Sequence, residues 1–145
     1  MQWAQRKYVN LDGVNVHYVE AGAGPTVLLL HGLGTSLITW RQNVGPLAAA
    51  GFHVLAPDLP GHGDSDKPRH LSYDPLSGAH LLHRFLQSQG VAHAHAVQEA
   101  LPHSQVRILS HCGHWPQLEK PELFNPLLVQ FLQGTLHHSP RTGGR

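Results

Sequence analysis

The sequence predicts an α/β fold, in which an N-terminal β-hairpin leads into a mostly parallel sheet with flanking helices. Three observations predict it. Two β-rich runs flank Asp12-Gly13, a dipeptide typical of a tight hairpin turn. Two continuous apolar runs, 26–30 and 53–56, have the composition of strands buried on both faces of a parallel sheet. Helical patterns alternate with these runs, which is typical of a parallel sheet with helices on both faces.

The predicted elements follow one another along the chain. The hairpin strands are expected at 8–11 and 14–19, and buried strands at 26–30, 53–56 and 106–109. Helices are expected at 40–50, 76–89, 94–101 and 123–132. The segment 57–75 is rich in Pro, Gly, Asp and Ser, and is expected to form a loop.

Length and composition limit the classes of function. The chain has 145 residues, 41% of them hydrophobic, which suits one domain with a core. Complete α/β domains often have roughly 200–250 residues, so this one is short. A net charge of +1 without a basic block gives no reason to expect a nucleic acid or an anionic membrane as partner. The first residues lack the apolar stretch of a signal peptide and no run is long enough to cross a bilayer, so a cytoplasmic protein is expected.

Cysteine and histidine usage argues against disulfide and metal centres. Cys112 is the single cysteine, so no intrachain disulfide can form. The 14 histidines include the close pairs 93/95 and 137/138. Zinc sites need three or four ligands at defined spacing, and no CxxC or HExxH pattern is present. We therefore expect surface histidines, no metal and no cofactor, with a histidine-based metal or small-ligand binder as the less favoured alternative.

Three segments carry a specific pattern. His31-Gly32-Leu33-Gly34 follows an apolar run, the sequence DLPGHGDS occupies 58–65, and CGHWPQLEKPE occupies 112–122. Together they resemble the α/β-hydrolase superfamily. The His-Gly-x-Gly form is similar to esterases and carbon–carbon bond hydrolases, whereas epoxide hydrolases more often have proline at its last position. On this basis, epoxide hydrolases are expected to be the less similar branch.

The resemblance implies roles for individual residues. It makes the Leu33 backbone amide one donor of an oxyanion hole, which stabilises negative charge on a carbonyl oxygen under attack. It makes His114 the general base of a Ser-His-Asp triad, a role that suits imidazole because it titrates near neutrality. Gly34 and Trp115 are candidate substrate-binding residues. Asp58, with the glycines that follow it, is implied to fix a turn and to take no part in catalysis.

The nucleophile is missing from this pattern. The superfamily presents its serine in a sharp G-x-S-x-G turn, and no such sequence occurs in the chain. Ser65 lacks these glycines and is expected to be an exposed loop hydroxyl. Cys112 lacks the preceding glycine and matches the histidine loop instead, so it is not expected to be a nucleophile. The loop that bears the triad acid and the substrate-selecting lid have no counterpart either.

The missing elements form one interior block. Residues 7–90 look like the N-terminal half of the superfamily fold and 93–133 like its C-terminal segment, with a junction near 91–92. We expect one truncated α/β-hydrolase domain over 1–136 and a disordered tail over 137–145. Without the nucleophile strand, 106–109 is expected to take the free place beside 26–30. The expected sheet order is the hairpin, then 53–56, then 26–30, then 106–109.

Two functions compete. The favoured interpretation is a protein descended from a serine hydrolase of esters or similar small carbonyl substrates. We expect this chain to be inactive, because loss of triad members leaves little beyond binding. The alternative is a non-catalytic fragment that self-associates, or pairs with another subunit, through an exposed sheet edge. A longer parent enzyme that carries the missing block is a further alternative.

Overall fold

The computed structural model describes residues 4–91 and 115–137, and these residues contain one four-stranded sheet. The strands are β1 (Gln5–Leu11), β2 (Val14–Ala21), β3 (Thr26–Leu28) and β4 (His53–Pro57). Their order across the sheet is β1-β2-β4-β3. β3 and β4 are parallel, whereas the other two neighbouring pairs are antiparallel. This arrangement confirms the α/β class and the predicted order of the hairpin, 53–56 and 26–30.

The hairpin turns at the predicted dipeptide. Asp12 and Gly13 have φ values of +51° and +86°, the left-handed pair that a type I′ turn requires. The Asn10 side chain supports the turn, since its Oδ1 accepts from the Gly13 N–H at 2.9 Å. Both strands run further from the turn than predicted, because pairing continues out to Gln5 and Glu20.

The prediction that 26–30 is buried on both faces is wrong. Only residues 26–28 form a strand, all three are half-buried, and Leu30 is 40% exposed. The run is apolar enough for a central strand, but within the described residues β4 is its single neighbour. The strand predicted at 106–109 and the helix predicted at 94–101 lie outside the described residues.

The first predicted helix is divided in two. A 3₁₀ turn, η1 (Leu37–Trp40), is followed by a separate short helix, α1 (Val44–Ala49). Pro46 explains the division, because a residue without an N–H is tolerated in the first turn of a helix but not in the interior of the 40–50 helix predicted. The other described helices are α2 (Pro75–Ser88), α3 (Pro116–Glu119) and α4 (Pro121–His137).

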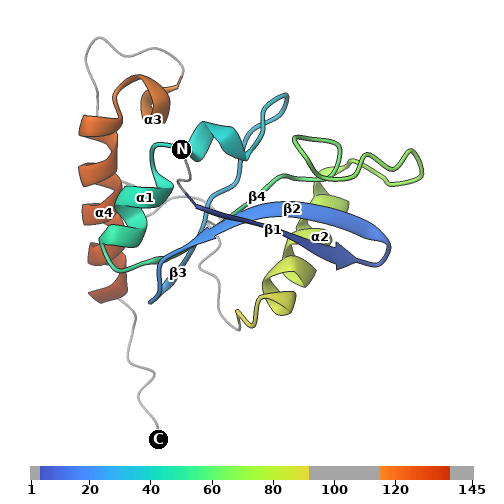
Figure 1. Cartoon of the computed structure of the whole chain (residues 1–145), viewed down its shortest axis with the longest axis horizontal. Helices are drawn as coiled ribbons and strands as arrows, with labels where there is room; N and C mark the ends of the chain where they lie inside the picture. The colour runs from blue at the N-terminus through green and yellow to red at the C-terminus, as the bar shows by residue number, and fades with distance from the viewer. Residues whose placement is uncertain (1–3, 92–114, 138–145) are drawn as a thin grey trace, which may run out of the picture.

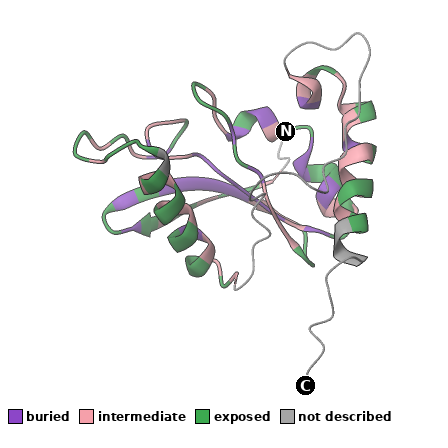
Figure 2. Cartoon of the chain, turned by 180° about the vertical axis from the view of Figure 1, so that it is seen from behind, coloured by how far each residue is buried: buried purple, intermediate pink, exposed green. Residues whose placement is uncertain are grey.

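Helices cover both faces of the sheet (Figure 1). α1 and α4 lie on one face, where Leu47 of α1 packs with Val54 and Ala56 of β4, and α4 adds three side chains, Leu128, Val129 and Leu132. α2 lies on the other face, where Phe85 meets Tyr18 edge-on with ring centroids 5.1 Å apart. Figure 2 shows the buried residues running along the strands between these two helical layers.

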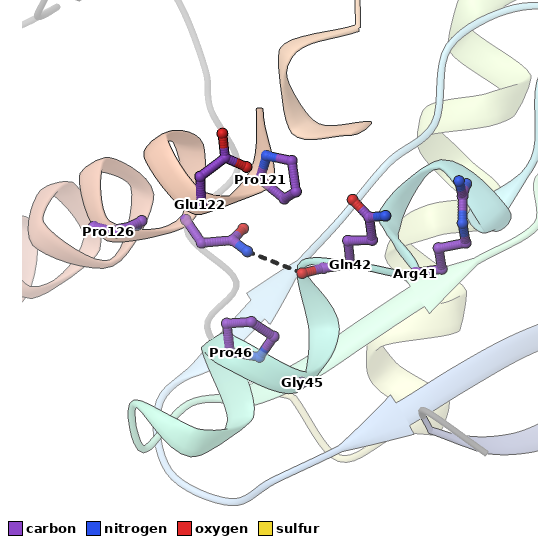
Figure 3. A pocket seen from close by; sticks show the side chains of 8 residues that line it. Arg41, Gln42, Gly45, Pro46, Pro121, Glu122 and Pro126 are labelled. Atoms are coloured by element: carbon purple, nitrogen blue, oxygen red, sulfur yellow. Dashed lines mark hydrogen bonds between the residues drawn. The ribbon is translucent and has the colours of Figure 1, made fainter. Parts of the chain in front are cut away.

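Two amide side chains fasten α4 to the rest of the domain. Asn43, fully buried just before α1, donates from Nδ2 to Oδ1 of Asn125. Asn125 in turn donates from its own Nδ2 to the Gln42 carbonyl at 2.9 Å, the bond drawn in Figure 3. Beside this contact a hollow of about 580 Å³ lies between α1 and α4, and its lining includes Pro46, Pro121 and Pro126. Its ionisable side chains, Arg41 and Glu122, make no catalytic cluster.

Candidate active site at the carboxyl edge of the parallel strands

Two loops meet where the parallel strands β3 and β4 end. The first, residues 31–36, carries the His-Gly-x-Gly sequence, and the second is 58–65. His31 joins them, because its Nε2 accepts from the Leu59 N–H at 3.0 Å. Sites in open α/β sheets lie at this edge, beyond the carboxyl ends of the strands. The two loops therefore form the candidate site of this fold.

The 31–36 loop contains a tight turn from Gly32 to Thr35. The Thr35 N–H donates to the Gly32 carbonyl at 3.3 Å, and Gly34 has φ +75°. Leu33 has a negative φ, since Asp12 is the single non-glycine residue with positive φ in the described part of the chain. This combination defines a type II turn, which requires glycine at its third position.

The carbonyl of Gly32 fixes the direction of the next amide. It accepts from the Thr35 N–H, from Thr35 Oγ1 at 2.8 Å and from the His31 ring at 2.9 Å. In a trans peptide the C=O and N–H point in opposite directions. The Leu33 N–H therefore points away from the turn, and it has no hydrogen-bond partner among the described residues. Leu33 as a whole is 95% exposed, so the turn presents a solvent-exposed amide that has no partner in the described part of the chain.

His31 itself is a structural element. Its Nδ1 donates to the Gly32 carbonyl while its Nε2 accepts from Leu59, so both ring nitrogens are engaged. The ring is buried and lies 5.1 Å from the His62 ring, centroid to centroid. With both nitrogens occupied, His31 is not available as a proton acceptor. Its contribution is to hold the two loops together.

A single buried carboxylate organises the 58–65 loop. Asp58 Oδ1 accepts from the Leu37 N–H at 2.7 Å, and its Oδ2 accepts from the Asp64 N–H at 3.0 Å and from His17 Nδ1 at 2.8 Å. It thereby ties the start of η1 to its own loop and to β2. A methyl group added to Gly63 would lie 2.1 Å from Asp58 Oδ2, so only glycine fits there. These contacts fit the turn-fixing role that the resemblance implies.

Ser65 does not occupy the place predicted for it. It is buried at 3% exposure, where its hydroxyl donates to the Asp58 carbonyl at 2.7 Å and accepts from the His17 N–H at 2.8 Å. The expectation of an exposed loop hydroxyl is wrong, because the loop folds back onto β2 and its serine replaces a strand partner. A hydroxyl held in this way is not presented to a substrate.

His17 is a buried residue that the sequence analysis did not single out. Its ring lies between Asp58 and Arg6, with Arg6 Nε 3.3 Å from His17 Nε2. Arg6, His17 and Asp58 all line a hollow of about 500 Å³. The alternation along β2 placed position 17 on the same face as Val19, which is the signal that could have indicated its burial.

The other predicted site residues are only partly described. Leu33 and Gly34 lie together in the turn, whereas His114 and Cys112 lie outside the described residues. Trp115 is half-buried just before α3, and its backbone N–H donates to Glu119 Oε1 at 3.0 Å. Among the described residues no group of three or more His, Cys, Asp or Glu side chains could hold a metal ion.

Comparison with known proteins gives one consistent family. A family model described as "alpha/beta hydrolase fold" matches residues 25–97. Among curated proteins, an epoxide hydrolase of Caballeronia sordidicola is 42% identical over 66 residues, which are 45% of this chain and 20% of that protein. The dihydrolipoyllysine-residue acetyltransferase component of an acetoin cleaving system of Cupriavidus necator is 38% identical over 99 residues, 68% of this chain and 26% of that protein.

Solved structures agree with these matches. An epoxide hydrolase from Vigna radiata superposes with a TM-score of 0.58 at 32% identity, covering 61% of this chain and 29% of that one. Epoxide hydrolases, which the His-Gly-x-Gly form disfavoured, are thus among the similar proteins, so the residue at position 34 does not separate the branches. The chain spans about a quarter or less of the curated relatives described above. None of its described helices has the length and apolar character to cross a membrane.

Proposed function

The chain belongs to the α/β-hydrolase family, and we propose that it retains one half of a serine-hydrolase site without the nucleophile. The retained half is the Leu33 amide, acting as an oxyanion donor, together with His114 as the inherited general base. The observation that carries the proposal is the outward N–H of Leu33, which has no partner among residues 4–91 and 115–137, in a turn whose Gly32 carbonyl accepts from three donors. A donor fixed before a ligand arrives needs no reorganisation when charge develops.

The same proposal implies that the chain alone has no hydrolase activity. A general base needs a hydroxyl to deprotonate and an acid to orient it. The sequence contains no G-x-S-x-G turn, and Ser65 is engaged in the Asp58 network. The ligand class that the half-site suits is a small molecule with a carbonyl or carboxylate oxygen, as in an ester. Gly34 and Trp115 would border that ligand.

An active-site probe tests the proposal without knowledge of the substrate. The purified protein, shown to be folded by circular dichroism and a cooperative unfolding transition, is treated with a fluorophosphonate and its intact mass is measured. An established serine hydrolase labelled in parallel confirms that the reagent is active. We expect no mass increase. A one-to-one adduct that is lost in His114→Ala would reveal an unrecognised nucleophile and overturn the proposal.

A second candidate function is association through the sheet edge. β3 has one strand neighbour among the described residues, and an unpaired strand edge is a template for another chain. In that case the protein would act as a subunit rather than as a hydrolase. Sedimentation velocity over a range of concentrations tests it, since a dimer would appear as concentration rises and a constant monomer would exclude it.

A further inference from the structure

The hollow beside His17 has the size and the lining of a small-molecule site. Its volume of about 500 Å³ is within the range of roughly 300–1,000 Å³ that ligand pockets occupy. Its walls come from the start of β1, from β2, from η1 and from the 58–65 loop. The apolar lining residues are Ala4, Val19, Leu37 and Ile38, and the ionisable ones are Arg6, His17, Asp58 and Asp64. A pocket of this kind binds an apolar body and orients it through a few polar groups.

The His17 ring contributes a hydrogen-bond acceptor to this lining. Its side chain is 3% exposed, and its Nδ1 lies 2.8 Å from Asp58 Oδ2. Its Nε2 lies 3.3 Å from Nε of Arg6, a nitrogen that can only donate. Nδ1 therefore carries the proton, and Nε2 accepts from Arg6 over a distance beyond the usual range of roughly 2.7–3.2 Å. The acceptor is buried, but its partner holds it only weakly.

The Arg6 guanidinium bonds to two acceptors at once. Its Nε donates to His17 Nε2, and its Nη2 donates to Asp64 Oδ2. Because Nε and Nη2 belong to one planar N–C–N group, the two acceptors lie side by side and face the same fork. The Arg6 and Asp64 side chains are 62% and 54% exposed, and ion pairs with such exposure contribute little to stability. Arg6 can therefore leave this place at low cost, and a ligand group of the same shape can occupy it.

We propose that this hollow binds a small organic cation of the amidinium or guanidinium type. The planar N–C–N group of the ligand replaces that of Arg6 between His17 Nε2 and the Asp64 carboxylate. The apolar body of the ligand lies against the apolar part of the lining, formed by Val19, Leu37 and Ile38.

The charges around the hollow determine the charge of the ligand. Once Arg6 has moved away, the charged lining residues in the described part of the chain are Asp58 and Asp64, both negative. Asp58 already accepts from three donors, so the Asp64 carboxylate is the one that pairs with a cation. A carboxylate ligand, as proposed for the Leu33 amide, would meet two like charges here. The cation site is thus distinct from the site of the proposed function and does not depend on it.

Benzamidine is a suitable probe, because it joins an amidinium to a small apolar ring. In ¹⁵N-labelled protein its binding is followed at the backbone amides of Leu37 and Asp64, which both donate to Asp58 beside the hollow. We expect saturable shifts of these two amides at millimolar benzamidine. Arg6→Ala removes the competing guanidinium and should tighten binding by about two- to fivefold, the contribution of one exposed ion pair. If Arg6→Ala fails to fold, Arg6→Met, which keeps the apolar stem, replaces it.

Three comparisons separate this site from unspecific attraction between charges. In the Arg6→Ala background, Asp64→Asn should weaken the binding of benzamidine by about threefold or more, because the charged partner is lost. Benzamide has a similar shape without the charge, and should bind more weakly than benzamidine to the same variant. Arg84→Ala frees the exposed carboxylate of Asp12, which does not line the hollow, and should leave the affinity unchanged.

Three results would overturn the proposal. The first is the absence of saturable shifts at Leu37 and Asp64 in Arg6→Ala. The second is an affinity that Arg6→Ala leaves unchanged or weakens, since the guanidinium would then not compete with the ligand. The third is equal affinity for benzamidine and benzamide, which would exclude the ion pair with Asp64. None of these results bears on the Leu33 amide, whose proposed ligand is a carbonyl or carboxylate compound.

Discussion

The two loops at the carboxyl edge of the sheet differ in how their polar groups are used. In the 58–65 loop the Asp58 carboxylate has three donors and the Ser65 hydroxyl has two partners. In the 31–36 loop the carbonyl of Gly32 is saturated, but the Leu33 N–H is left without a partner among the described residues. The polar side chains Asp58 and Ser65 of the 58–65 loop are thus hydrogen-bonded within the protein. The 31–36 loop is fixed by its own hydrogen bonds and leaves the Leu33 N–H exposed. The difference supports the proposal that the 58–65 loop is a scaffold and that the 31–36 loop binds a ligand.

Removing the carboxylate of Asp58 should have the largest effect on stability. Asp58→Ala leaves the Leu37 and Asp64 N–H groups and the His17 ring without an acceptor, in a place that is 2% exposed. We expect a loss of about 3–5 kcal/mol in the free energy of unfolding, measured by urea denaturation. Asp58→Asn keeps one acceptor and should lose less. A loss below 1 kcal/mol for Asp58→Ala would mean that this loop is not the scaffold.

Gly63→Ala should destabilise the same 58–65 loop, because the added methyl group would displace the Asp58 carboxylate. The added methyl would lie 2.1 Å from Asp58 Oδ2, and φ at this position is +48°. We expect a cost of about 3 kcal/mol, of which about 1–2 is the left-handed backbone alone. Gly13→Ala is the matched control, since its φ is +86° with nothing within 4 Å. Equal costs for the two variants, measured by thermal unfolding, would exclude the steric contact.

Glu20 provides a half-buried carboxylate for comparison with Asp58. The Lys7 ammonium, and then His53, hold the pKa of Glu20 below its usual value. A depressed pKa means that the stabilisation is complete above the unfolded-state pKa of about 4.3 and is lost as pH falls through the folded-state pKa. Glu20→Gln should therefore cost about 0.5 kcal/mol at pH 7 and progressively less as the pH is lowered below about 4.3, in urea titrations at a series of pH values. A larger penalty at low pH would contradict this sign.

Leu33→Pro should have a small effect on stability and the most selective effect on binding. Proline is favoured at the second position of a type II turn, and glycine before it accepts the restricted conformation. The substitution removes the exposed N–H while changing stability by about 1 kcal/mol or less. We expect butyrate to shift the Gly34 amide resonance in the unmodified protein and in Leu33→Ala, but not in Leu33→Pro. A shift that persists in Leu33→Pro would place the donor elsewhere.

The sequence was sufficient for the parts of the fold that depend on local patterns. Asp12-Gly13 predicted the hairpin, the apolar run at 53–56 predicted β4, and the stripe at 76–89 predicted α2. These signals arise from backbone geometry and periodicity within a few residues, so they can be read without tertiary information. The His-Gly-x-Gly pattern likewise located the turn that exposes the Leu33 amide.

Apart from the 40–50 helix, which Pro46 divides, the errors concern properties that depend on distant contacts. Ser65 was predicted to be exposed because its neighbours are loop residues, but its burial depends on β2, whose His17 is 48 positions away. The burial of 26–30 was overestimated because an apolar composition indicates that a strand can be buried. It does not indicate how many neighbouring strands or helices cover it. His17 was not predicted as a buried polar residue, because a single histidine in an apolar strand forms no recognisable motif. Its partner Asp58 lies 41 positions further along the chain.

The amide pair between Asn43 and Asn125 spans 82 positions and sets an order of events during synthesis. A ribosome adds about 5–20 residues per second, so at least four seconds separate the emergence of the two residues. During that interval the apolar cluster that Leu128, Val129 and Leu132 of α4 pack against lacks this cover. The nascent chain is thus more exposed to aggregation before α4 has been synthesised, and a chaperone that binds apolar surface would act on it in this interval.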